Sequence, residues 1–224
     1  DRVVASIFVN PTQFAPHEDF GAYPRTETRD LELLASAGCT LAYCPSPADI
    51  YPDGDSTTVA VSGVSQPLEG AFRPHFFGGV ATVVARLFVH VAPDVALFGE
   101  KDFQQLQVIR RMTRDLGFAI EIIGGQTLRE PDGLAMSSRN AYLTASERQT
   151  ALTLYTSLKL AKERIQAGEP VGPALAEARA GLAAAGFAPV DYVAACDAAT
   201  LNAYPDDSPA PTGRAGRILG AATL

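Results

Sequence analysis

The sequence is poor in cysteine and histidine and contains no long hydrophobic run. No uninterrupted apolar stretch reaches the roughly 18 residues that a membrane-spanning helix needs, so we expect no transmembrane segment. Three widely spaced cysteines favour reduced thiols over a disulfide framework, and with no visible signal peptide they favour a cytoplasmic setting. The cysteines are Cys39, Cys44 and Cys196.

Positive charge is also in deficit. With 18 Lys and Arg against 25 Asp and Glu, the net charge of −7 argues against a broad nucleic-acid or lipid-headgroup surface. His17, His75 and His90 have no His or Cys partner at ligand spacing, which predicts no metal site built by the protein's own side chains. A Gly-x-Gly-x-x-Gly fingerprint and a Walker A loop are both absent. Any anionic ligand would therefore need a local positive pocket of another kind.

What the chain does contain is an alternation of short apolar runs with helical patterns. The run over residues 3–9 predicts a strand buried on both faces. Further strands are predicted over 40–44, 57–61, 95–98 and 119–123, and helices over 27–37, 80–91 and 103–116. Strands that alternate with helices predict an α/β fold, here a Rossmann-like, doubly wound parallel sheet.

Beyond about Gly124 the composition shifts. Thr144 and Glu147 form a capping-box pattern before a long amphipathic helix that continues to about residue 165. An alanine-rich helix over 173–185 and strands over 189–195 and 217–221 complete the predicted elements. We therefore expect two domains, a Rossmann-like domain over 1–126 and a smaller C-terminal α+β lid domain over 127–224.

Two short motifs point to nucleotide chemistry. Residues 99–105, Gly-Glu-Lys-Asp-Phe-Gln-Gln, follow a predicted strand and open a helical pattern, so Lys101 should lie where free backbone N–H groups and the helix dipole attract an anion. Residues 136–140, Met-Ser-Ser-Arg-Asn, place two hydroxyls and an arginine side by side in a loop that contains Gly133. That arrangement suits the oxygens of a polyphosphate.

A third motif, Asn-Pro-Thr-Gln-Phe over 10–14, leaves the first strand at its predicted carboxyl end, the edge where open α/β sheets bind ligands. Gln13 there offers an amide that can both donate and accept hydrogen bonds, as a hydroxy acid requires. Taken singly, each of the three motifs also fits a structural role, as a turn or as a solvated lysine at a loop–helix junction.

In their residues and in their order along the chain, these motifs together resemble the pantoate–β-alanine ligase family of the nucleotidyltransferase superfamily. That superfamily is related in fold to class I aminoacyl-tRNA synthetases. The matching segments are residues 7–14, 23–26, 68–70, 79–84, 98–110 and 132–140. The resemblance implies an ATP-dependent condensation of (R)-pantoate with β-alanine to pantothenate through a pantoyl adenylate, with release of AMP and pyrophosphate. It also implies a homodimer with no nucleic-acid or membrane partner.

The resemblance assigns roles to individual residues. Adenylation depends on positioning and charge neutralisation, so one group of residues would spread the charge on the phosphates together with Mg²⁺. These catalytic residues are Lys101, Ser137, Ser138 and Arg139. The ATP-binding residues are Gly99, Glu100, Lys101, Asp102, Leu128, Met136, Ser137, Ser138 and Arg139. Gln13 and Gln105 would hold pantoate by its hydroxyls and carboxylate, with Gln13 also near β-alanine. No residue is assigned as a metal ligand.

One departure from the family concerns the segment upstream. The family carries there a strand and a Met-Gly-x-Leu-His-x-Gly-His loop, whose histidines hold the ATP phosphates, and no residue of this sequence matches them. The last strand likewise stops at Leu224, short of the family's usual end. We therefore expect a piece of a longer protein, or a truncated domain that is nearly inactive as it stands. Two alternatives stay open, a fragment that binds pantoate or assembles without turnover, and another adenylyltransferase of the same fold.

Overall fold

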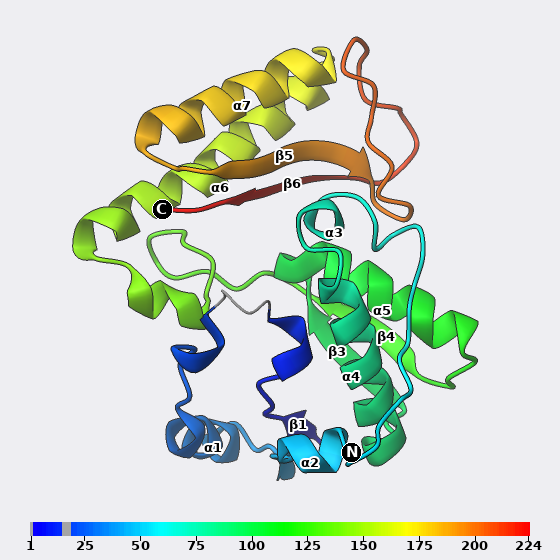
Figure 1. Ribbon diagram of the computed structural model, residues 1–224. Coiled ribbons are helices and arrows are strands. Elements are labelled where there is room, and N and C mark those ends of the chain that lie inside the picture. The colour runs from blue at the N-terminus through cyan, green and yellow to red at the C-terminus, as the bar shows by residue number, and fades with distance from the viewer. Residues whose placement is uncertain (1, 15–18) are drawn as a thin grey trace. The chain divides into compact units, whose positions relative to one another are not determined.

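The computed structural model describes residues 2–14 and 19–224, which form two compact units (Figure 1). Unit 1 consists of Asp1–Val61, His75–Phe98 and Val108–Gly124. Unit 2 consists of Ser62–Pro74, Gly99–Gln107 and Gly125–Leu224. No helix in the described part of the chain is long and apolar enough to cross a membrane. His17, which has no His or Cys at metal-ligand spacing in the sequence, lies outside the described residues.

Unit 1 opens with a β-α-β element. Strand β1 (Val4–Ser6) is followed by the 3₁₀ turns η1 (Pro11–Gln13) and η2 (Asp19–Gly21) and by helix α1 (Glu27–Ser36). Strand β2 (Leu41–Tyr43) then pairs with β1 in parallel, with Ala5 opposite Ala42. A parallel pair joined by a helix is the unit from which α/β sheets are built, as the sequence predicts.

The core of unit 1 lies around helix α4 (Phe76–Val91), which is buried on most of its surface. Phe88, near its end, makes edge-on ring contacts with Phe98 and Phe118, at centroid distances of 6.2 and 5.7 Å. Strands β3 (Val95–Gly99) and β4 (Glu121–Gly125) pair with each other. Helix α5 (Phe103–Asp115) connects them, and its apolar residues are fully buried. The molecule is thus a mixed α/β protein.

Of the strand predictions in this unit, one is wrong in part and one is wrong entirely. The run over residues 3–9 forms only a three-residue strand, and Val3 and Val4 are 56% and 39% exposed. Within the described residues β1 pairs with β2 alone, so one of its edges carries no neighbouring strand. The last bond between the two strands runs from Ile7 N to Tyr43 O, after which the chain turns at Asn10.

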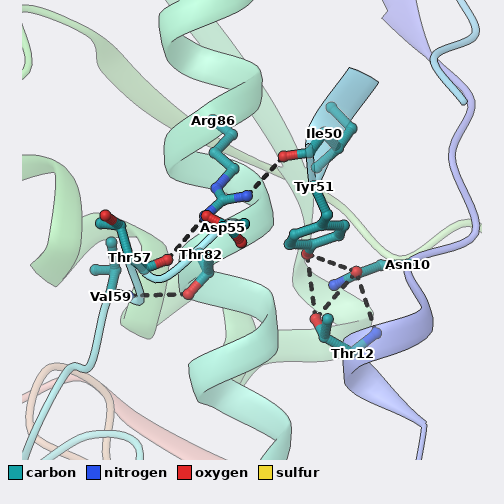
Figure 2. A network of polar contacts seen from close by, with 9 residues as sticks. All are labelled: Asn10, Thr12, Ile50, Tyr51, Asp55, Thr57, Val59, Thr82 and Arg86. Carbon is teal, nitrogen blue, oxygen red and sulfur yellow. Dashed lines mark hydrogen bonds and ion pairs between the residues drawn. The ribbon is translucent and has the colours of Figure 1, made fainter. Parts of the chain in front are cut away.

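The second difference concerns residues 57–61, which form no strand. Their backbone groups bond to side chains of α4 instead of to a sheet. Val59 N donates to Thr82 Oγ1 at 2.9 Å, and Thr57 O accepts from Arg86 Nη2 at 2.7 Å. The predicted strand is therefore an irregular segment, two of whose backbone groups are bonded by side chains of a helix (Figure 2).

Unit 2 contains the long helices α6 (Ala145–Gln166) and α7 (Val171–Ala185) and the strands β5 (Val190–Asp197) and β6 (Gly216–Ala222), which pair antiparallel. The predicted capping box is present, with Glu147 N bonded to Thr144 Oγ1 and Thr144 N bonded to Glu147 Oε2. Val171, Leu182 and Val193 form the centre of its core. These helices and strands make an α+β arrangement.

Short helices and turns complete the structure. They are α2 (Pro47–Ile50), α3 (Glu69–Phe72), η3 (Glu100–Asp102) and η4 (Ser138–Tyr142). The cysteines Cys39, Cys44 and Cys196 are all free, and burial raises the pKa of the Cys196 thiol to about 11. That thiol is therefore protonated and unreactive at neutral pH.

Candidate active site

The motif at residues 10–14 forms the turn η1 directly after β1, and it is organised around Asn10. Asn10 is only 5% exposed, although it is polar. Its Nδ2 donates to Gln13 Oε1 at 2.8 Å and to Gly79 O at 3.2 Å. A buried amide of this kind is costly unless both of its ends are bonded, and the other end is bonded as well.

The oxygen end of the same amide collects three hydrogen bonds. Asn10 Oδ1 accepts from Thr12 N at 3.3 Å, from Thr12 Oγ1 at 3.0 Å and from Tyr51 Oη at 2.7 Å. Tyr51 follows α2, 41 residues along the chain, and Figure 2 shows its hydroxyl pointing at Asn10 and Thr12. Burial, the largest influence, raises the pKa of Tyr51, so its hydroxyl is protonated and can donate at neutral pH.

Tyr51 is itself held by Arg86 of α4. The Arg86 guanidinium lies 4.8 Å from the centre of the Tyr51 ring, and its Nη1 donates to Ile50 O at 2.6 Å. Its Nη2 pairs with Asp55 at 2.6 Å, and that hydrogen bond lowers the pKa of the Asp55 carboxyl. The segment that carries Tyr51 is thus fixed to the same helix that supplies Gly79 (Figure 2).

Gly79 marks the closest approach of α4 to η1. A Cβ atom on Gly79 would lie 2.7 Å from Thr12 O, closer than real Cβ contacts come, and 3.0 Å from Thr12 Oγ1. Only a glycine lets the helix backbone approach the turn closely enough for Asn10 to reach Gly79 O.

The lysine motif lies in unit 2, where η3 joins β3 to α5. Lys101 Nζ lies 3.3 Å from Asp102 Oδ1, and its side chain is 41% exposed. Glu100 Oε2 lies 3.4 Å from Arg217 Nη2 of β6, whose guanidinium is 4.6 Å from the centre of the Phe103 ring. The carboxylate of Glu100 thus has a partner in the strand β6, which sequence reasoning did not connect with this motif.

The adjacent glutamines at the start of α5 have different surroundings. Gln104 is buried, and its Nε2 donates to Val64 O at 3.0 Å and to Pro67 O at 2.6 Å, while its Oε1 accepts from Glu69 N at 3.1 Å. Gln105, predicted to bind pantoate, is half-buried. Gln104 therefore supports the turn before α3, and the neighbouring Gln105 is the more accessible of the two.

The serine motif follows a short hairpin that brings Leu128 and Met136 together. Met136 N donates to Leu128 O at 2.9 Å, and Arg129 pairs with Ala135 across an antiparallel bridge. Leu128 and Met136 are 71% and 53% exposed, so the hairpin presents apolar side chains to solvent. Two predicted ATP-binding residues that are eight positions apart are therefore neighbours.

Side chains from α6 hold this hairpin in place. Asp132 accepts from Arg148 Nη2 at 2.8 Å, and the guanidinium of Arg129 lies 3.4 Å from the centre of the Tyr155 ring. The backbone N–H of Leu134 is the largest influence lowering the pKa of Asp132, and Arg148 adds to it. The loop is thereby fixed just before the residues expected to bind phosphate.

Ser137 caps the N-terminus of the turn η4, and its hydroxyl accepts from Arg139 N at 3.3 Å. Ser138 and Arg139 belong to the same turn, and Asn140 Nδ2 donates to Ala135 O at 3.0 Å. Two hydroxyls and a guanidinium thus come from consecutive residues of a short turn.

The predicted site residues fall in both units. Gln13 belongs to unit 1, whereas Lys101, Gln105 and the serine motif belong to unit 2. In the part of the chain that the structure covers, no three His, Cys, Asp or Glu side chains gather in a way that could hold a metal ion. Mg²⁺ does not need such a cage, since it is commonly held by one or two carboxylates and the substrate's phosphates, and Asp102 offers one carboxylate next to Lys101.

The fold is that of a mixed α/β protein, and comparison with known proteins shows the family to which the chain belongs. The family profile described as Pantoate-beta-alanine ligase matches residues 1–224. The chain belongs to the pantoate–β-alanine ligase family, whose enzymes join pantoate to β-alanine.

Relatives in two bacteria are each named pantothenate synthetase. The protein of Hyphomonas neptunium is 57% identical over 223 residues, which is all of this chain and 76% of the relative. That of Caulobacter vibrioides is 57% identical over 225 residues, again all of this chain and 78% of the relative. The enzymatic class of the chain therefore rests on identity along its whole length.

Solved structures agree with the fold. The crystal structure of pantothenate synthetase from Thermus thermophilus matches with a TM-score of 0.90 at 47% identity, over 98% of this chain and 79% of that one. The pantoate-beta-alanine ligase of Francisella tularensis, complexed with beta-gamma ATP and beta-alanine, matches with a TM-score of 0.75 at 34% identity. That match covers 86% of this chain and 70% of the other.

The close approach at Gly79 gives a test of the site's architecture. Gly79→Ala places a methyl group against Thr12 O, so we expect a loss of roughly 1–3 kcal/mol in the free energy of unfolding, measured by urea denaturation. Gly78→Ala is the matched control, because a Cβ there meets nothing within 4 Å and alanine favours a helix over glycine by about 1 kcal/mol. Equal stability of the two variants would show that the turn yields to the added methyl group.

Proposed function

We propose that the protein makes pantothenate in two steps, through a pantoyl adenylate. The carboxylate of (R)-pantoate attacks the α-phosphorus of ATP and pyrophosphate leaves; the amine of β-alanine then attacks the acyl carbon and AMP leaves. The observation that carries this proposal is the set of phosphate-type donors on two short turns of unit 2, Lys101 in η3 and the serine motif in η4. The ligands of the Francisella tularensis enzyme support the use of ATP and β-alanine.

In this mechanism the phosphate residues work by position and charge. Lys101 neutralises charge that develops on the phosphates, while the hydroxyls of Ser137 and Ser138 and the guanidinium of Arg139 donate to phosphate oxygens. None of these groups forms a covalent bond, since adenylation needs in-line placement of the two reactants. Mg²⁺, carried by ATP, supplies additional positive charge at the phosphates.

The nucleotide and the acid contact different residues. Glycine at position 99 permits backbone approach to the nucleotide, Glu100 and Asp102 flank the lysine, and the exposed Leu128 and Met136 offer an apolar surface for the base. Gln13 and Gln105 hold the hydroxyls and carboxylate of pantoate, and their neutral amides add no charge that would repel the anionic acid.

Compartment and assembly complete the proposal. We propose that the enzyme works in the cytoplasm as a homodimer and that its partners are the three small substrates. The free cysteines support a reducing compartment. Light scattering on the purified protein tests the dimer, and a mass equal to one chain would contradict it.

The lysine is the first residue to test. In the natural gene product that carries this chain, Lys101→Ala should lower the adenylation rate by about 10²–10³, the effect of removing one preorganised group that stabilises charge. Single-turnover kinetics with ATP and pantoate measure it. Lys159→Ala is the matched control, an exposed lysine of α6 that is also paired with an acidic side chain, and it should leave the rate unchanged. A loss below threefold at Lys101, with the fold intact, would remove this residue from the phosphate site.

The adjacent glutamines Gln104 and Gln105 allow a sharp test of the proposed pantoate site. Gln105→Ala should weaken pantoate binding about 5- to 150-fold, because a buried polar group left unpaired costs roughly 1–3 kcal/mol, and ATP binding should change little. Separate calorimetric titrations of the two ligands measure this. Gln104→Ala, which removes bonds to Val64 and Pro67, should instead lower the melting temperature. Equal weakening of pantoate and ATP by Gln105→Ala would contradict the assignment.

A further inference from the structure

The hydrogen bonds around Asn10 fix the orientation of its amide. A primary amide has one end that accepts and another that donates, and turning it over exchanges them. Tyr51 Oη lies 2.7 Å from Asn10 Oδ1, and both the N–H and the hydroxyl of Thr12 donate to the same oxygen. Thr12 N–H can only donate and Gly79 O can only accept, so the oxygen of the Asn10 amide faces Thr12 and its NH₂ end faces Gly79 O and Gln13 Oε1. The Tyr51 hydroxyl, which also lies 3.1 Å from Thr12 Oγ1, adds a further donor to the oxygen end.

The same reasoning carries over to Gln13. Its Oε1 accepts from Asn10 Nδ2 at 2.8 Å, so the oxygen branch of its amide is directed at Asn10 and the NH₂ branch is directed away from it. A ligand that approaches the NH₂ branch meets hydrogen-bond donors. Such donors match the carboxylate or hydroxyl oxygens of a hydroxy acid, which are acceptors.

Tyr51, Asn10 and Gln13 form a hydrogen-bonded relay. Tyr51 is its member that comes from outside the turn. Its ring is half-buried beneath the Arg86 guanidinium, and its backbone N–H is bonded to Pro47 O at 2.7 Å. Arg86 also binds Ile50 O and Asp55, so the hydroxyl of Tyr51 projects from a segment held on several sides (Figure 2). The Tyr51 hydroxyl, which donates to Asn10 Oδ1 and also lies 3.1 Å from Thr12 Oγ1, is therefore carried by a segment that contacts outside η1 hold in place.

We propose that Tyr51 is a positioning residue for pantoate, which acts through Asn10 to keep the donor end of the Gln13 amide toward the substrate. This inference rests on the proposed role of Gln13. The inference adds Tyr51, a residue that does not itself contact the substrate. It also specifies that pantoate meets the NH₂ end of the Gln13 amide.

The test removes a single hydroxyl. In the natural gene product that carries this chain, Tyr51→Phe should raise the KM for pantoate about 5- to 10-fold, while the KM for ATP changes less than twofold. Tyr43→Phe is the matched control, since it also deletes one tyrosine hydroxyl of unit 1 bonded to a side chain, His90 Nδ1 at 2.8 Å. The control should leave both constants unchanged. A purely structural role of Tyr51 would instead lower the melting temperature and raise both KM values, and that outcome would overturn the proposal.

A double-mutant cycle separates the relay from the function on which it rests. Tyr51→Phe in a Gln13→Ala background should change the KM for pantoate less than twofold, because the group that Tyr51 orients is gone. If the two substitutions multiply independently, the relay is refuted. If Gln13→Ala alone leaves pantoate unaffected, the proposed role of Gln13 fails first, whatever Tyr51 does.

A second variant changes Asn10, the residue between Tyr51 and Gln13 in the relay. Asn10→Asp replaces the NH₂ group by an oxygen that cannot donate to Gln13 Oε1, so the Gln13 amide should turn over and present its oxygen to the substrate. We expect a larger loss of pantoate affinity than for Tyr51→Phe, with ATP affinity kept. Unchanged pantoate affinity in this variant would also refute the relay.

Discussion

The contact on which unit 1 depends is the approach of two backbones, helix α4 and the turn η1, at Gly79 and Thr12. It leaves no room for a side chain, and it places Gly79 O within reach of the buried Asn10 amide. Every polar atom of that amide then has a partner, which makes the burial of Asn10 energetically tolerable. The turn that carries Gln13 is therefore fixed by a helix that lies more than sixty residues later in the chain.

The elements that could be predicted from the sequence are those that depend on neighbouring residues. The capping box at Thr144 and the helix that it opens need only a hydroxyl, a carboxylate and an apolar period in one stretch. The alternation of strands and helices was predictable for the same reason, and several motifs in order were enough to indicate the family. Which of these residues meet substrate stays a prediction, for Gln13 and Gln105 as for Lys101.

The features that the sequence did not reveal depend on partners far away along the chain. Residues 57–61 have the composition of a strand, yet Thr82 bonds to Val59 N and Arg86 bonds to Thr57 O. Asn10 was visible only as part of a turn motif, and nothing near it indicates Tyr51, which is 41 residues away. A pattern within one segment cannot predict which side chain of another segment will complete its hydrogen bonds.

The way in which α4 holds the irregular segment has an evolutionary consequence. Thr82 and Arg86 bind backbone atoms of Val59 and Thr57. Many different side chains at positions 57 and 59 would therefore leave these two hydrogen bonds unchanged. Proline at position 59 is an exception, because it has no N–H to donate. Loss of a single residue, by contrast, would shift both backbone groups away from their partners on the helix. This stretch can therefore diverge in sequence while its length stays constant.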